Sequence, residues 1–324
     1  MEEVCCIVGR TGTPRFAKMV SWKYANLPAS LVSEDLKLHH NRPTSCCFIQ
    51  TLSESVGELV GKHEFAFKYA LPKLPTIVKY VAVSRDGTTV PVIDEGYREA
   101  MTGTISLYDA TGTRLHTIYT ACAPEYGKQT FDEVMDIELQ KIKSLYLDVL
   151  YVGIADGAKD NWSYLESRTD IYVLDFYHAC EHLSKVSVVM GRNEQQRKEW
   201  CNSACSDLKN KTNGAWYVLR ELRTLHKQKK EAKAPIPDVL KETITYFENN
   251  LKRMNYTSYQ KKHIPIGSGV TEAACKVVVK QRLCASGMKW NINNIQNMLR
   301  MRCLVLTQER WGQFWNRLTQ EKCA

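Results

Sequence analysis

Apolar and polar residues follow one another along the first half of the chain in patterns that predict strands. The segment 76–84 is rich in β-branched and aromatic residues and leads to Asp86 and a glycine, which favours a strand ending at this dipeptide. The segment 147–155 is almost continuously apolar, as is typical of a strand buried on both faces of a sheet. Residues 171–174 predict a further strand, which leads to another acid, Asp175. The predicted strands therefore end beside carboxylates.

Between these strands the pattern changes twice. After a loop over 90–101, two strand-like runs, 104–108 and 114–120, are joined by a connection that contains glycine, which predicts a hairpin. Residues 130–145 then keep a helical period and begin in the form of a capping box, Thr130-x-x-Glu133. A short helical piece precedes the last strand. This order of strand, hairpin, helix, strand, helix and strand indicates a mixed α/β fold.

The remaining segments have helical patterns. Residues 50–67 carry apolar side chains at helical spacing. The region from about 179 to 260 is charged and poor in strand-forming residues, with helices expected over 192–200, 216–230 and 237–253. We therefore expect four parts: a helical lead-in suited to DNA binding over 1–75, the first part of an α/β core over 76–185, a helical insertion over 186–262, and the second part of the core with C-terminal helices over 263–324.

Composition excludes several classes of protein. With 324 residues, of which 44% are hydrophobic, the chain is long enough to bury a substantial core and is not disordered. No segment approaches the roughly 20 apolar residues that span a bilayer. No signal-peptide pattern begins the chain, so we expect its 12 cysteines to be reduced thiols of a cytoplasmic protein. The formal net charge of +9 suits a partner with a phosphate backbone, although many basic proteins bind no nucleic acid.

Three carboxylates are candidates for chemistry. Asp86 and Asp156 each follow an apolar run and precede a glycine, which places them at the carboxyl ends of strands, where open α/β folds form their sites. Taken singly, such a dipeptide is more often only a turn. Glu272 stands in the first turn of a predicted helix that Ser268 caps and Gly287 ends. The helix dipole alone would also favour an acid there.

The predicted helix also carries cations on the face of its acid. Lys276 and Lys280 follow Glu272 at i+4 and i+8, so they suit contacts with a phosphate backbone. Three valines over 277–279 lower the helix propensity, which leaves a strand as an alternative. Three carboxylates from separate elements are able to hold two divalent cations about 4 Å apart for phosphodiester chemistry. Oxygen ligands favour Mg²⁺ or Mn²⁺ over zinc.

A second group of metal-binding residue types follows the last predicted strand. His178 and His182 stand at i and i+4, and they are able to hold zinc together with Cys180 or a more distant cysteine. The sequence contains no second pair of cysteines with zinc-ribbon spacing. We therefore favour the alternative in which His178 packs or bonds near the active carboxylates.

Taken together, these landmarks resemble the bacterial insertion-sequence transposases of the Mutator-related DDE group, and most closely its Kra-type elements. The motifs are weak singly but specific in this order. The resemblance extends from about residue 77 to 304 and rests on Ser84-Arg85-Asp86-Gly87-Thr88 with Gly96-Tyr97-Arg98-Glu99, on Ala155-Asp156-Gly157-Ala158, on Val173 to His178, and on Gly267-Ser268-Gly269 through Glu272, Lys276 and Arg282 to Trp290.

The resemblance implies a ribonuclease H-like fold, in which helices flank a mixed five-stranded sheet and an all-helical insertion precedes the last catalytic helix. It implies that Asp86, Asp156 and Glu272 are catalytic and bind two Mg²⁺ or Mn²⁺ ions. Asp175 and His178 match a family motif with a supporting role, either orienting the site or holding the DNA strand. The implied activity is metal-dependent DNA strand cleavage and strand transfer at the ends of an insertion sequence.

The implied partners are the terminal inverted repeats, the target DNA and further copies of the chain, in the bacterial nucleoid and away from any membrane. Lys276, Lys280 and Arg282 are expected to bind DNA. So is Arg85, which stands where relatives carry an apolar or small residue. The lead-in is shorter than the N-terminal region of such transposases, which predicts a shortened copy or an internal start at Met1. Two other functions stay open: a transposase-derived DNA-binding protein, and a ribonuclease H-like nuclease without strand transfer.

Overall fold

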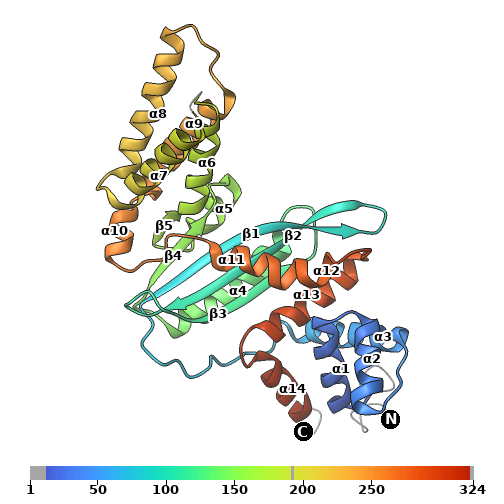
Figure 1. Cartoon of the computed structure of the whole chain (residues 1–324). Coiled ribbons are helices and arrows are strands. Elements are labelled where there is room, and N and C mark those ends of the chain that lie inside the picture. Colours follow the sequence, from blue (N-terminus) through green and yellow to red (C-terminus); the bar gives the residue numbers. More distant parts are fainter. Residues whose placement is uncertain (1–11, 191–192, 322–324) are drawn as a thin grey trace.

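The computed structural model describes residues 12–190 and 193–321, so Met1 and the rest of the lead-in before residue 12 lie outside the described residues. Within these ranges, five strands form one mixed sheet in the order β3-β2-β1-β4-β5 (Figure 1). β1 to β3 are antiparallel neighbours, while β4 and β5 run parallel to β1. This order confirms a mixed α/β fold and is consistent with ribonuclease H-like topology. The strands are β1 (Tyr80–Val92), β2 (Gly96–Tyr108), β3 (Arg114–Cys122), β4 (Leu150–Ala155) and β5 (Ile171–Leu174).

β1 is longer than the sequence predicts and does not end at Asp86. It pairs with β2 along its whole length, from its first residue to its last. The loop expected over 90–101 is therefore wrong, because most of it is strand and only residues 93–95 turn the chain. Gly96, with a φ of 73°, takes the left-handed backbone that this turn requires. Asp86 consequently projects from the middle of a strand.

The hairpin of β2 and β3 is confirmed, and Asp109 holds its connection. The Oδ1 atom of Asp109 accepts hydrogen bonds from the backbone N–H groups of Thr111 at 2.8 Å and Thr113 at 2.9 Å. This side chain folds the chain back on itself, as aspartates commonly do in turns. β5 lies where the sequence places it, and β4 begins three residues later than expected.

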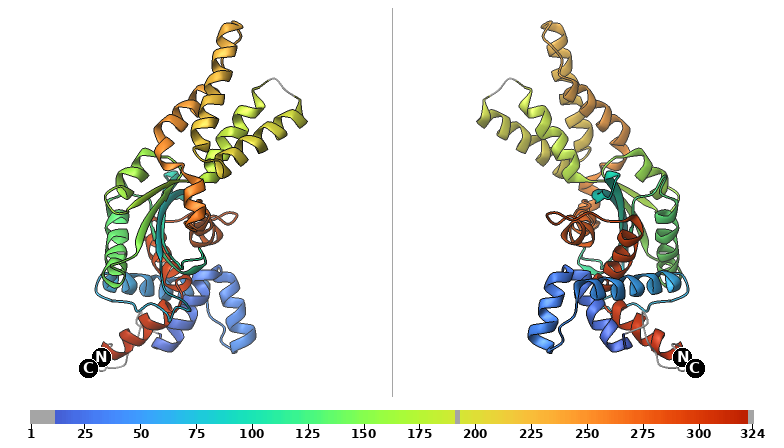
Figure 2. Two further views of the ribbon diagram at one scale, coloured as in Figure 1. Left: turned by 90° about the vertical axis from the view of Figure 1, so that its left-hand side faces the viewer. Right: turned by 90° about the vertical axis from the view of Figure 1, so that its right-hand side faces the viewer.

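Helices cover both faces of the sheet. α4 (Gln129–Leu145) and α5 (Lys159–Leu165) lie on one face, and α11 (Gly269–Ala274) lies on the other, across β1 and β2 (Figure 2). α4 confirms the helix expected over 130–145. Its start is not a capping box, because the carboxylate of Glu125, five residues before Thr130, accepts the N–H groups of the first turn.

A group of helices projects from the β5 edge of the sheet, and we call it the helical arm (Figure 1). Its buried side chains, among them Leu183, Trp200 and Phe247, belong to the same apolar core as the central strands. The helices expected over 216–230 and 237–253 are present with shifted ends. The one expected over 192–200 begins at Glu194 within the described residues and runs ten residues further. The arm consists of α6 (Phe176–Val188), α7 (Glu194–Asn210), α8 (Gly214–Glu231), α9 (Asp238–Asn250), η1 (Leu251–Arg253) and α10 (Tyr256–Lys261).

The first and last helices of the chain pack together at the other end of the molecule (Figure 1). They share a second apolar core with the far ends of β1, β2 and β3. Arg302 lies buried inside it, donating to the carbonyl oxygens of Val278 at 2.7 Å and Ala25 at 2.5 Å. The helices are α1 (Pro14–Asn26), α2 (Ala29–His40), α3 (Cys46–His63), which covers most of the helical pattern expected over 50–67, α13 (Ile292–Leu306) and α14 (Arg310–Glu321).

The segment after the arm is one helical run with a change of pitch inside it. α11 passes into η2 (Cys275–Lys280), a π-helical stretch, and then into α12 (Gln281–Leu283). The alternative of a strand over 277–279 is wrong, because these valines pack into the second core as part of the run. π-helical turns inside helices often mark functional sites. No helix in the described ranges is both long and apolar enough to cross a membrane.

Candidate active site

Asp86 sits on β1, near the middle of the sheet, beneath the helical run that contains Glu272. Its Oδ1 accepts the backbone N–H of Gly87 at 2.8 Å, and its Oδ2 lies 3.7 Å from the thiol of Cys275. Partial burial raises the pKa of Asp86, and the negative charge of Asp156 raises it further. The carboxylates of Asp86 and Asp156 are therefore close enough to repel each other.

Asp156 follows β4, which is the parallel neighbour of β1, so both acids reach the same region of the sheet. Its Oδ1 accepts hydrogen bonds from the backbone N–H of Ala158 and the amide of Asn161, both at 3.1 Å. No described residue donates a hydrogen bond to its Oδ2. Gly157 has a φ of 105°, a conformation that permits the sharp turn directly after the acid. One oxygen is thus oriented by the protein, and the other stays available.

Glu272 is held over the sheet by contacts that residues before and after it make along the helical run of α11 and η2. The hydroxyls of Thr271 and Thr104 of β2 lie 2.6 Å apart in a buried hydrogen bond. Cys275, one helical turn after Glu272, contacts Asp86. The carboxylate of Glu272 is part-exposed, and its Oε1 lies 3.6 Å from Nε2 of His178 and 3.4 Å from the Ser268 hydroxyl. The helical run therefore places Glu272 beside His178, while Cys275 of the same run contacts Asp86; among the described residues no hydrogen bond or ion pair joins the Glu272 carboxylate to Asp86 or Asp156.

Asp175 is fully buried and joins the start of α6 to the start of α11. Its Oδ1 accepts the backbone N–H groups of Tyr177 at 2.6 Å and His178 at 3.0 Å. Its Oδ2 accepts both the backbone N–H and the hydroxyl of Ser268. Ser268 was expected to cap the Glu272 helix, but its side chain makes no cap bond there. Its hydroxyl instead binds Asp175, so Asp175 acts as the cap of α6 and as an anchor for Glu272.

Ligand atoms of Asp175, His178 and Glu272 lie within 4.8 Å of one another, close enough to hold a metal ion. This group differs from the expected set, since it contains neither Asp86 nor Asp156. Each oxygen of Asp175 already accepts two hydrogen bonds, so a cation there would have to displace them. Among the described residues, Asp156 keeps one oxygen without a hydrogen-bond donor, and the second oxygen of Asp86 accepts only the weak donor of the Cys275 thiol. Their hard oxygens fit Mg²⁺ or Mn²⁺.

The zinc alternative with His182 and Cys180 gains no support. The ring of His182 stacks on that of Tyr246, with centroids 4.0 Å apart. Among the described residues, the group around His178 that is close enough to bind a metal ion contains Asp175 and Glu272, and neither His182 nor Cys180. His178 therefore lies near the carboxylates, as the favoured alternative expected.

Two arginines expected to bind DNA point inward. Arg85 is only 2% exposed and pairs with Asp132 at 2.5 Å and Asp160 at 3.3 Å. Arg282 is 3% exposed, and its Nε donates to the carbonyl of Tyr24 at 2.9 Å. Because both guanidinium groups serve the protein interior, these expectations are corrected: neither is available to a phosphate. Lys276 and Lys280 are exposed on the helical run that carries Glu272 and remain candidates.

Sequence reasoning missed two residues that shape this region. Tyr246 of α9 donates its hydroxyl to the backbone carbonyl of Asp156 at 2.7 Å. Nothing local could have revealed it, since 90 residues separate the pair. Asn161 lies five positions after Asp156, and an amide side chain so soon after a candidate acid is a signal that the sequence did contain. Comparison with protein-family models and with curated proteins gives no significant match.

Proposed function

We propose that the chain is a DNA transposase of the DDE type, which cleaves DNA strands and transfers them at the ends of an insertion sequence. The observation that carries the proposal is the closeness of two carboxylates: Asp86 lies on β1, Asp156 directly follows the parallel neighbour β4, and the charge of Asp156 raises the pKa of Asp86. Two carboxylates held close together in a partly buried region favour the binding of divalent cations between them. The ribonuclease H-like sheet order supports the same assignment.

In this proposal Asp86, Asp156 and Glu272 hold two Mg²⁺ or Mn²⁺ ions. When bound, the ions supply Lewis-acid activation of water or of a 3′-hydroxyl and stabilise the leaving oxygen. Asn161 and Gly157 fix the direction of the Asp156 carboxylate. His178 lies against Glu272 and orients its carboxylate, while Asp175 fixes the start of the helix that carries it. Lys276 and Lys280 bind the phosphate backbone, and copies of the chain pair two DNA ends.

The deciding experiment uses the purified full chain and labelled duplex DNA whose sequence flanks the coding region in its genome. With Mg²⁺ we expect nicked strands and joined products, and with EDTA neither. Asp156→Asn and Asp86→Asn should abolish both products, because each removes a charged ligand. Asp148→Asn is the matched control, since Asp148 is exposed at the opposite end of β4, and it should keep the wild-type rate.

Other outcomes point to the other functions. Nicks without joined products would indicate a nuclease that lacks strand transfer. Binding in EDTA with no cleavage in Mg²⁺ or Mn²⁺ would indicate a DNA-binding protein derived from a transposase. Full cleavage by Asp156→Asn would remove Asp156 from the catalytic set.

A further inference from the structure

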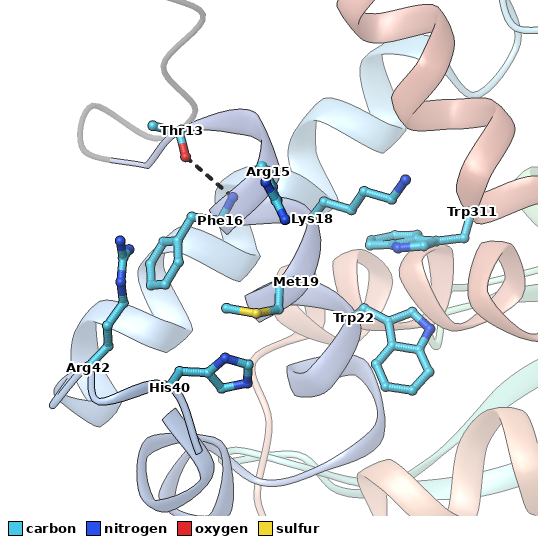
Figure 3. A pocket seen from close by; sticks show the side chains of 9 residues that line it. All are labelled: Thr13, Arg15, Phe16, Lys18, Met19, Trp22, His40, Arg42 and Trp311. Carbon is cyan, nitrogen blue, oxygen red and sulfur yellow. Dashed lines mark hydrogen bonds between the residues drawn. The ribbon is translucent and has the colours of Figure 1, made fainter. Parts of the chain in front are cut away.

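A hollow of about 790 Å³, whose lining residues are drawn in Figure 3, opens among the helices at the end of the molecule opposite the helical arm (Figure 1). It lies between α1, the C-terminal end of α2 with the loop that follows, and the first residues of α14. None of the residues that line it belongs to the candidate active site. The hollow is therefore separate from that site.

The pattern of α1 explains how the hollow receives its side chains. Ala17, Val20 and Tyr24 form one stripe of this helix and are buried in the second core. Arg15, Lys18 and Trp22 stand at i, i+3 and i+7, so they form another stripe, which faces the hollow (Figure 3). One face of α1 therefore packs in the core, and another faces the hollow.

Cations surround the hollow. Arg15, Lys18 and Arg42 line it, and no carboxylate of a described residue forms an ion pair with any of them. The nearby acid Asp35 is occupied, since its carboxylate lies 2.7 Å from Nζ of Lys23 and 3.9 Å from Nε2 of His40. A concave surface lined by one sign of charge concentrates ligands of the opposite sign. The hollow therefore suits an anionic ligand.

The hollow also offers aromatic surface. Trp22 leaves 47% of its surface exposed, and Trp311 lies across from it in the wall formed by α14 (Figure 3). The guanidinium of Arg42 lies over the ring of Phe16 at 5.1 Å, so this cation is held in place beside the hollow. An exposed indole next to fixed cations is the combination that binds unpaired nucleic-acid strands, in which bases stack on rings and phosphates meet cations.

We propose that this hollow binds a DNA strand with unpaired bases, with one base stacked on Trp22 and the flanking phosphates contacting Arg15, Lys18 and Arg42. An acidic peptide would meet the cations but would leave the indole without a planar partner. Duplex DNA would present phosphates, but its bases stack on one another and are closed to Trp22. The choice of DNA rests on the proposed function, whereas the stacking and charge rest on the hollow itself.

The test measures binding of a fluorescent 20-nucleotide oligothymidylate to the full chain by anisotropy, in EDTA so that no cleavage occurs. Trp22→Ala should raise Kd by roughly tenfold, the usual effect of losing one base stack. Trp22→Phe should recover most of the affinity, because a phenyl ring still stacks. Trp216→Ala is the matched control, since Trp216 on α8 is also 47% exposed, and it should leave Kd unchanged.

The proposal is overturned if Trp22→Ala leaves the affinity unchanged, or if Trp22→Ala and Trp216→Ala reduce it equally. It is also overturned if the protein binds duplex DNA, an oligouridylate or polyglutamate more tightly than the oligothymidylate in a way that depends on Trp22. A thermal unfolding scan shows whether Trp22→Ala is folded; if it is not, Trp22→Leu, which keeps apolar bulk without a planar ring, takes its place and should weaken binding as Trp22→Ala would. The two proposals fail separately. A chain that cleaves DNA without Trp22-dependent binding refutes only this one, and Trp22-dependent binding without cleavage refutes only the catalytic one.

Discussion

Asp175 accepts four hydrogen bonds inside the protein, two on each oxygen. Asp175→Asn replaces one acceptor oxygen by an NH₂ group that faces N–H or O–H donors. We expect this change to lower the free energy of unfolding by about 2 kcal/mol, the usual cost of leaving buried groups unpaired. Urea denaturation measures the loss. DNA cleavage should fall in part, because the helix that carries Glu272 loses its anchor while the carboxylates themselves remain.

Ser268→Ala is the control for this prediction. It removes the hydroxyl bond to Asp175 but keeps the backbone N–H bond, so the loss in unfolding free energy should be smaller, about 1 kcal/mol. If Asp175→Asn were no less stable than Ser268→Ala, the four-bond junction would not hold α6 and α11 together. An undiminished cleavage rate would remove Asp175 from the site.

His116 of β3 makes stability depend on pH. Burial, with a smaller contribution from the charge of Arg310, lowers the pKa of His116 to about 4. In the unfolded chain this group takes up its proton near pH 6.5. Between pH 6.5 and 4, His116 is therefore protonated in the unfolded state but neutral in the folded state, so the free energy of unfolding decreases as the pH falls. We expect the titration of His116 to lower the free energy of unfolding by about 1–2 kcal/mol across this pH range.

The measurement is urea denaturation at pH 7 and at pH 4.5 for the wild type and for His116→Gln, which cannot titrate. The variant should lose less stability than the wild type between the two pH values. Equal losses in both proteins would show that His116 takes up its proton normally in the folded state.

At the scale of elements, the helical arm reaches the sheet through tyrosine hydroxyls. Tyr246 donates to the carbonyl of Asp156 at 2.7 Å, and a Cβ at Gly157 would lie 2.6 Å from its ring. Tyr246→Phe removes this bond next to a proposed metal ligand. We expect a loss of about 1 kcal/mol in unfolding free energy and a fall of roughly tenfold in the cleavage rate, because small displacements of catalytic groups are costly.

Tyr259→Phe is a closely matched control. Tyr259 of α10 also donates its hydroxyl to a sheet carbonyl, that of Tyr172 at 3.0 Å, but away from the carboxylates. This variant should lose a similar unfolding free energy and keep the cleavage rate. Should both variants cleave equally well, the arm would stabilise the sheet without positioning Asp156.

The elements show where local patterns suffice and where they do not. The β5 and α4 segments were predicted closely, because their residues alone determine strand or helix. The end of β1 was missed, because a glycine beside Asp86 resembles a turn, and only pairing with β2 continues the strand past it. The π-helical turn of η2 was also missed, since it depends on how 277–279 pack into the second core.

The same distinction applies to the candidate site. Asp86, Asp156 and Glu272 remain proposed ligands, and the sequence points to each of them through a local signal, a buried strand or a glycine-framed helix start. Arg85 was misinterpreted because its partners, Asp132 and Asp160, come from two other elements. The position of a charged residue next to a candidate acid does not tell whether its side chain faces solvent or the interior. That depends on the tertiary packing.

At the scale of the whole molecule, not all of the basic residues behind the net charge of +9 are accessible to a ligand. Part of it lies in buried arginines such as Arg85, Arg282 and Arg302, which bind carboxylates and carbonyl oxygens. These charges cannot release counterions from DNA. The exposed lysines of η2, on the helical run of Glu272, and the cations that line the hollow are among the basic side chains that face solvent. If the protein binds DNA as proposed, we expect fewer phosphate contacts than the 44 basic residues of the sequence.

Salt dependence tests this division of charge. The logarithm of the affinity for duplex DNA should fall linearly with the logarithm of salt concentration, with a slope of about −0.9 per phosphate contact. In EDTA, the double variant Lys276→Ala with Lys280→Ala should reduce the steepness by about 2. Lys198→Ala, an exposed site on α7 whose lysine pairs with Glu194 at 2.7 Å, should leave it unchanged. A double variant with the wild-type slope would mean that DNA does not pass over η2, and hence not over Glu272.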